Sequence, residues 1–220
     1  MRSSPVFVRP PCPGCDQGQD GAHRGASFHV KHAVGSTGYE ALLIGGRSGV
    51  GKSTVAWEVS AQLQDGAQLL DGPVAHCLIE GDFLDQAYPP PEGDPTRRKL
   101  TEDNLTALWR NFAALGYRRL IYTNTVSILE SDLIVRAMGG NPRITPVLLT
   151  STDETASARL SAREIGSQFD AHVHRSSAMA RWLDKGAPLS VVRVPTDGRD
   201  VISIARDVVA ATRWAGSPLS

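Results

Sequence analysis

The segment that most constrains the fold of this 220-residue chain is GGRSGVGKST, residues 45–54. It follows an apolar run at residues 41–44 and precedes a stretch whose apolar residues recur at helical spacing. A buried strand, a glycine-rich turn and an amphipathic helix in direct succession form the start of a βα unit. We therefore predict an α/β fold in which this turn lies at the carboxyl end of a parallel strand.

Apolar runs and amphipathic segments continue to alternate along the rest of the chain, as expected for βαβ units. One amphipathic segment places Trp109 and Phe112 on an apolar helical face, so we assign both side chains to the core rather than to a ligand site. That face comprises Leu105, Leu108, Trp109, Phe112 and Leu115. The predicted strands cover residues 40–45, 75–81, 119–123, 145–150 and 190–194.

Two further helices are predicted after the fourth and fifth strands. Ser151 and Glu154 have the spacing of a capping box, which predicts a helix that begins near Asp153. Apolar residues at helical spacing between positions 201 and 209 mark the last helix.

The charge balance excludes several classes of partner. Lys plus Arg and Asp plus Glu both number 23, so no global charge draws the chain to nucleic acid or to an anionic membrane. The chain has three Cys and no apolar run long enough to span a membrane, and its N-terminus lacks the apolar core of a secretory signal. We expect a soluble, cytoplasmic protein with no nucleic-acid partner.

The N-terminal residues 1–38 differ in composition from the rest. They are rich in Pro, Gly, Ser and His and show no sustained period, which predicts a poorly ordered extension. Cys12 and Cys15 have the spacing of half a zinc site, but no second pair follows, so an unstructured tail is favoured. We place the folded domain at 39–214 and a C-terminal tail at 215–220.

The residue types of the glycine-rich turn point to phosphate binding. Gly46, Gly51, Lys52 and Ser53 satisfy the Walker A pattern, in which backbone N–H groups and the helix start hold phosphate oxygens. Lys52 is expected to reach the β and γ phosphates, and the Ser53 hydroxyl to bind Mg²⁺. The predicted nucleotide-binding residues of this loop are Gly46, Arg47, Ser48, Gly49, Val50, Gly51, Lys52, Ser53 and Thr54.

Two carboxylates at the end of the second predicted strand are candidates for binding Mg²⁺ and for activating the hydroxyl that receives the phosphate. In LIEGDFLD, Glu80 and Asp82 are two residues apart, so extended backbone directs both side chains to one face. The carboxyl ends of parallel strands meet at one edge, which brings these acids beside the phosphate loop. We expect Glu80 to hold a Mg²⁺-bound water and Asp82 to accept a proton. The alternative for both is a solvated acid at a strand end.

A phosphate loop followed by a strand that ends in EGDFLD resembles the small-molecule P-loop kinases, such as gluconate kinase, adenylylsulfate kinase, shikimate kinase and chloramphenicol phosphotransferase. Asp82 matches the acceptor-activating Asp of the chloramphenicol enzyme. Residues 105–138 and 148–164 are also similar to the tunicamycin-resistance family of P-loop proteins. The resemblance covers residues 39–212 and implies a three-layer α/β domain with a five-stranded parallel sheet of order 2-3-1-4-5.

The resemblance also implies a lid and a base-binding loop. Arg159 and Arg163 match the Arg-x-x-x-Arg that leads into a lid at about 164–176, with Arg159 on adenine and Arg163 on the transferred phosphate. Four residues apart on a helix, both lie on one face, although a solvated face has the same spacing. Arg175, with His172 or His174, is a candidate for the far side of the lid. The loop Thr196, Asp197 and Gly198 would border the base, or form a turn and N-cap.

One departure from the general P-loop pattern bears on the reaction. The third predicted strand runs into Asn124 and Thr125 without the Asp of a Walker B motif, so Mg²⁺ must depend on Ser53 and on waters held by Glu80 or Asp82. We predict an ATP- and Mg²⁺-dependent transfer of phosphate to the hydroxyl of a small metabolite or natural product. If the acceptor is an antibiotic, this transfer would confer resistance. The alternative is an ATP-binding sequestration protein that transfers nothing. Basic residues in 83–104 would suit an acidic or phosphorylated acceptor, and the alternative is an ordinary exposed loop.

Overall fold

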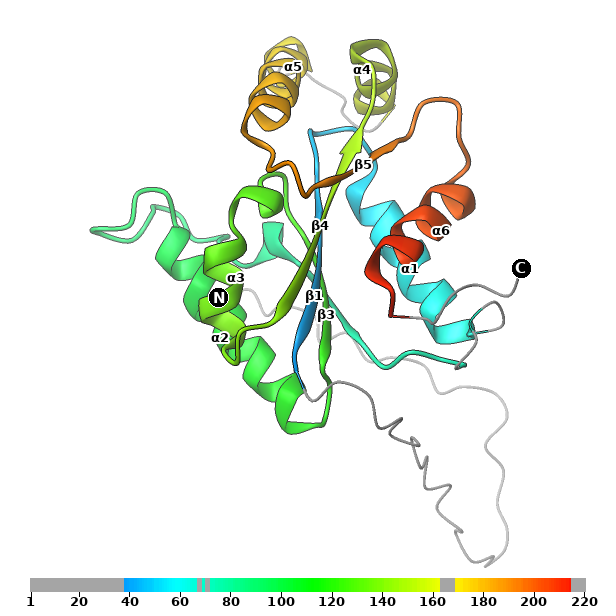
Figure 1. Cartoon of the computed structure of the whole chain (residues 1–220). Helices are drawn as coiled ribbons and strands as arrows, with labels where there is room; N and C mark the ends of the chain where they lie inside the picture. Colours follow the sequence, from blue (N-terminus) through cyan, green and yellow to red (C-terminus); the bar gives the residue numbers. More distant parts are fainter. Residues whose placement is uncertain (1–37, 67–68, 70–71, 163–168, 215–220) are drawn as a thin grey trace, which may run out of the picture. The chain divides into compact units, whose positions relative to one another are not determined.

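The computed structural model describes residues 38–66, 69, 72–162 and 169–214, and within them a single parallel sheet (Figure 1). The strand order is β2-β3-β1-β4-β5, and every neighbouring pair is parallel. This confirms the predicted α/β fold and strand order. The strands are β1 (Glu40–Gly45), β2 (Cys77–Glu80), β3 (Arg119–Thr123), β4 (Arg143–Thr150) and β5 (Val192–Pro195).

The helices cover both faces of this sheet. α1 and α6 pack together on one face and α2 and α3 on the other, while α4 and α5 lie beyond the carboxyl ends of the strands (Figure 1). No helix in the described part of the chain is both long and apolar enough to cross a bilayer. The helices are α1 (Lys52–Asp65), α2 (Arg98–Ala114), α3 (Ser131–Met138), α4 (Asp153–Ser161), α5 (Phe169–Gly186) and α6 (Val201–Thr212), with short 3₁₀ turns η1 (Gly81–Phe83) and η2 (Ser127–Leu129).

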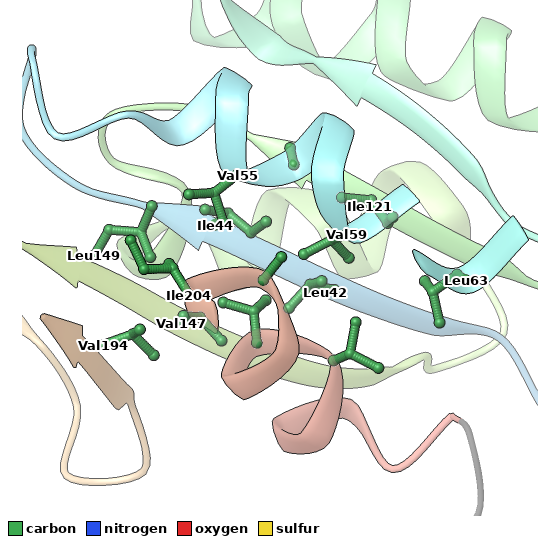
Figure 2. Close-up of a cluster of buried hydrophobic side chains, with 14 of the residues drawn as sticks. Leu42, Ile44, Val55, Val59, Leu63, Ile121, Val147, Leu149, Val194 and Ile204 are labelled. Carbon is green, nitrogen blue, oxygen red and sulfur yellow. The ribbon is translucent and has the colours of Figure 1, made fainter. Parts of the chain in front are cut away.

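The core beneath α1 and α6 fixes where the phosphate loop begins and ends. Val55, Val59 and Leu63 of α1 are buried, as predicted, and pack against Leu42 and Ile44 of β1 (Figure 2). Every residue of β1 is buried because helices cover both faces of the sheet. For this reason the apolar residues 41–44 follow one another without alternating with polar residues. The loop at residues 46–51 is therefore held between a central strand and a helix that is fastened to the sheet.

The apolar face of α2 is shorter than its sequence predicts. Leu105 and Trp109 are buried, and the Trp109 Nε1–H donates to the Met138 carbonyl at 3.1 Å, which joins α2 to the end of α3. Phe112 is partly buried against the same core. Leu115, assigned to this face, is instead 77% exposed because α2 ends at Ala114 and Leu115 follows as the C-cap.

The start of α4 also differs in detail from the prediction. The helix begins at Asp153 as predicted, but the capping residue is Thr152, whose hydroxyl accepts a hydrogen bond from the Thr155 N–H. Ser151, predicted as the cap, has a buried hydroxyl that finds no hydrogen-bond partner in the described part of the chain. The capping-box spacing thus placed the helix correctly and the cap one residue too early.

We expect Leu105→Ala and Leu115→Ala to have very different effects on stability. Leu105→Ala leaves a cavity in the α2 core and should lower the free energy of unfolding by about 2–5 kcal/mol. Leu115→Ala should change it by less than about 0.5 kcal/mol, because that side chain is exposed. Urea denaturation followed by circular dichroism measures both values, and equal losses would contradict the position of Leu115.

Candidate functional site

The phosphate loop is shaped by close approach to α4. A Cβ on Gly49 would lie 2.7 Å from the Ala156 carbonyl oxygen and 3.0 Å from the Leu160 side chain, and its φ of +83° is left-handed. Only glycine combines that backbone conformation with such a contact. The loop then ends at Gly51, after which α1 begins with Lys52 and no side chain caps its first N–H groups. Those N–H groups remain directed at the loop, as phosphate binding requires.

The first turns of α1 carry the polar groups of the loop. The Lys52 ammonium donates to the Arg47 carbonyl at 3.4 Å, which lays the side chain along the loop. The Ser53 hydroxyl donates to Glu80 Oε2 at 2.8 Å. The Trp57 indole N–H donates to Glu80 Oε1 at 3.0 Å, from one turn further along α1. Both carboxylate oxygens of Glu80 are thus held by α1.

Ser53 and Glu80 form a donor set that suits Mg²⁺. The ion prefers oxygen ligands and is usually bound through one or two carboxylates together with substrate phosphates and waters. A hydroxyl and a carboxylate in contact beside a phosphate loop provide that combination. Within the described residues no three His, Cys, Asp or Glu side chains gather into a metal cluster, so a cation here would depend on the nucleotide for further ligands.

The turn between Glu80 and Asp82 has a fixed shape. A Cβ on Gly81 would meet the Tyr122 hydroxyl at 2.4 Å and the Thr123 carbonyl oxygen at 2.9 Å, so this backbone lies directly on β3. The chain turns there into η1, and Asp82 is its second residue. The predicted strand to residue 81 therefore ends one residue earlier, and the extended geometry expected for both acids does not reach Asp82.

Asp82 lies close to the phosphate loop all the same. The side chain is exposed at one face, and its pKa is raised above the ordinary aspartate value mainly because the neighbouring protein partly desolvates it, while the positive charge of Lys52 acts in the opposite direction. Asp85 and Glu80 add a smaller upward effect. Asn124 Nδ2 donates to Asp82 Oδ1 at 3.3 Å, so the side chain that follows β3 orients this carboxylate.

The residues predicted to surround the base lie together in the structure. Arg159 donates to the Val50 carbonyl at 3.1 Å, to the Thr196 hydroxyl at 3.0 Å and to the Thr196 carbonyl at 3.1 Å. A hydrogen bond from the Thr155 side chain is the main cause that holds the pKa of Asp197 below its usual value, and the N–H and hydroxyl of Thr152 also donate to this carboxylate. The phosphate loop, α4 and the loop after β5 are thereby joined. Contact of Arg159 or Gly198 with adenine stays a prediction.

Arg47 has a position that the sequence does not reveal. Its side chain is 3% exposed and lies against α4 and α5. Its guanidinium donates to the hydroxyls of Ser176 at 2.8 Å and Ser177 at 3.1 Å and forms an ion pair with Asp153. The Ser176 hydroxyl in turn donates to the Ser48 carbonyl at 2.8 Å. The loop is therefore tied to α4 and α5 by a buried cation.

The predicted lid lies only partly within the described residues. Arg163 and the residues up to 168 lie outside the described residues, as does the side chain of His172. His174 and Arg175 are exposed on α5. The roles predicted for Arg163, His174 and Arg175 at the lid remain predictions.

The basic residues of the expected acceptor region have protein partners. The Arg97 guanidinium stacks on the Tyr88 ring, 4.5 Å from its centroid, and Arg98 pairs with Glu130 and Asp132. Lys99 pairs with Asp103. Arg98 and Lys99 are thus neutralised by carboxylates of the chain and give no support to an acidic acceptor, whereas Arg97 is held by an aromatic ring and keeps its charge.

Sequence reasoning missed three contributors to the site: Trp57, Asn124 and Asp153. Trp57 is four residues after Ser53 on α1, so the helical repeat places both on one face and could have revealed their shared partner. From the sequence, Asn124 is recognised only as a position without the Asp of a Walker B motif, and its contact with Asp82 is not predicted. Asp153 has no signal of its own, because its partner Arg47 is far away in the sequence.

The fold and the loop define the class: this chain has the fold of the small-molecule P-loop kinases. A gluconokinase from Sinorhizobium meliloti is 18% identical, with a TM-score of 0.51 over 79% of this chain and 91% of that chain. A sugar kinase from Janibacter is 16% identical, with a TM-score of 0.53 over 78% and 93%. The tunicamycin resistance protein of Deinococcus radiodurans is 16% identical, with a TM-score of 0.52 over 78% and 94%.

These solved structures establish the fold, and their low identity leaves the activity of this chain to be argued from its own residues. No family model matches the sequence, and no curated protein matches it.

Trp57→Phe should weaken Mg²⁺-dependent nucleotide binding. Loss of one net hydrogen bond to Glu80 corresponds to about a two- to tenfold increase in the dissociation constant. Isothermal titration with an ATP analogue in the presence and absence of Mg²⁺ measures this change. Trp182→Phe is the matched control, because Trp182 is 52% exposed against 59% for Trp57. Equal effects of the two variants would show that Trp57 does not position Glu80.

Proposed function

We propose that the chain transfers the γ-phosphate of ATP to a hydroxyl of a small molecule. The observation that carries this proposal is the position of Asp82, a carboxylate with a raised pKa that is influenced by Lys52 of the phosphate loop. A raised pKa brings a carboxyl group nearer to the range in which it exchanges a proton at neutral pH, as a general base does. The fold supports the proposal, because it is shared with solved kinases of small molecules.

The proposed reaction assigns one task to each side chain. The acceptor oxygen attacks the γ-phosphorus, its proton passes to Asp82, and the bond between the γ-phosphorus and the bridging oxygen breaks to release ADP. Lys52 stabilises the negative charge that develops on the phosphate oxygens. Asn124 holds Asp82 in place through its amide N–H. Arg163 is proposed to contact the transferred phosphate from the lid.

Mg²⁺ would be held beside the loop by the residues that already meet there. Ser53 supplies a hydroxyl oxygen, and Glu80 accepts from a metal-bound water, with its carboxylate oriented by Trp57. The bound ion would neutralise phosphate charge. The base would lie near Thr196, Asp197 and Gly198, whose loop is fastened to α4 by Arg159 and Thr152.

A second candidate is a protein that binds ATP without transferring phosphate. The fold likeness to the tunicamycin resistance protein of Deinococcus radiodurans favours keeping it. In that case Asp82 would have no proton to accept and could be replaced without loss of function.

Asp82→Asn separates the two functions. In a phosphotransferase the variant should lose at least about 100-fold in kcat, because a positioned base contributes that much, while ATP affinity stays within about twofold. The assay incubates γ-labelled ATP with pools of polyols, nucleosides and antibiotics. Asp85→Asn, in the same loop, is the control and should retain activity. Absence of any labelled acceptor with the unaltered protein, while ATP binds, would reject transfer.

The pH dependence should show the environment of Asp82. Its ionised form is the base, so kcat/KM should fall as pH falls through a pKa that lies above the ordinary aspartate value. Lys52→Met removes a charge that lowers this pKa, so the pKa should rise further. A titration of the labelled Asp82 carboxyl carbon by NMR measures both values without activity. A lower pKa in Lys52→Met would contradict the assigned geometry.

A further inference from the structure

A cavity of about 320 Å³ lies behind the phosphate loop, on the side of the Arg47–Asp153 ion pair. Its walls are the carboxyl end of β4, the start of α4 and the middle of α5, with the Arg47 side chain on one side. Helices α4 and α5 are the two at the carboxyl edge of the sheet in Figure 1. The volume is within the range of small-molecule sites, and none of Lys52, Glu80 and Asp82 lines it.

The floor of this cavity is apolar. Leu148 and Leu149 of β4 and Leu183 of α5 are buried and line it, together with Ala180. Leu148 and Leu183 also belong to a packed cluster with Ile128. This floor is part of the core, so it offers a preformed surface for a hydrocarbon chain.

The charges around the cavity leave one cation unpaired. Arg47 is paired with Asp153, and Asp184 is paired with Arg193. Arg181 also lines the cavity, and within the described part of the chain its guanidinium forms no ion pair or hydrogen bond. Its charge acts on Asp153, whose pKa is held low chiefly by the hydrogen bond from Arg47. The lining holds two arginines and two aspartates, and Arg181 is the lining arginine whose donors are not used by an ion pair or hydrogen bond within the described residues.

A second polar group in the cavity has no partner. The Ser151 hydroxyl is buried, lines the cavity and makes no hydrogen bond to any of the residues that the structure describes. A buried hydroxyl without a partner costs free energy, and an acceptor oxygen from a ligand would remove that cost. An exposed cation and a buried hydroxyl donor beside an apolar floor are complementary to a carboxylate with a short hydrocarbon body.

We propose that this cavity binds a small monocarboxylic acid, with its carboxylate between Arg181 and Ser151 and its hydrocarbon chain on Leu148, Leu149 and Leu183. The site is distinct from the proposed nucleotide site and does not rest on the proposed function. The Arg47 side chain and its ion-pair partner Asp153 line the cavity, and the Arg47 backbone is part of the phosphate loop, so the two sites are neighbours that share this ion pair.

The test titrates the full-length protein with hexanoate by isothermal calorimetry, with and without a saturating nonhydrolysable ATP analogue. Hexanoate should bind in both conditions and more tightly than butanoate. Hexylammonium should not bind in either condition, and inorganic phosphate should not bind once the analogue fills the nucleotide site. Failure of hexanoate to bind, its displacement by the analogue, or equal binding of hexylammonium would each overturn the proposal, and none of these results depends on phosphate transfer.

Paired variants locate the site. Ala180→Leu fills the cavity and should abolish hexanoate binding, whereas Ala178→Leu, exposed on the same helix, should not. Arg181→Gln should weaken binding about tenfold, the effect of one charge-assisted hydrogen bond, while Arg206→Gln on α6 should leave it unchanged. Unchanged ATP-analogue affinity shows that each variant is folded. Equal binding by a folded Ala180→Leu or Arg181→Gln would place hexanoate elsewhere and reject the site.

Discussion

The buried guanidinium of Arg47 is the interaction on which the arrangement of this site depends. A cation that is 3% exposed must be paired and hydrogen-bonded, because an uncompensated buried charge is strongly destabilising. Here the required partners are Asp153 of α4 and Ser176 of α5, so satisfying one loop residue fixes two helices against the phosphate loop. Arg159 repeats the connection on the other side of α4, where it joins the loop to the segment after β5.

Much of the fold was accessible from the sequence because its signals are local. A continuous apolar run bounded by turn residues marked β1 and β3 with their observed bounds, and helical spacing marked the buried face of α1. The Walker A pattern joined one such strand to one such helix. The order of the five strands was not a local property and came from resemblance to a known fold, which the structure confirms.

The contacts within the site were accessible only in part. Ser53 and Glu80 were predicted to cooperate because strand ends and the loop share one edge of the sheet, and their hydrogen bond agrees with this. The partners of Arg47 were not predictable, since Ser176 is far along the chain and serines on a helix have no distinguishing spacing. Leu115 was wrongly assigned to the buried face of α2. The spacing of apolar residues predicts which face of a helix a residue occupies, but it does not predict the residue at which the helix ends.

The contact of the Gly81 backbone with β3 limits which substitutions this segment can accept. Because there is no room for a side chain at position 81, the backbone between Glu80 and Asp82 keeps its path, and that path sets the spacing of the two carboxylates. The loop that follows, from residue 84 to Arg97, is bound by no comparable restriction and is largely exposed. Substitutions in that loop can therefore reshape the surface beside η1 while the backbone that sets the spacing of the two carboxylates stays in place.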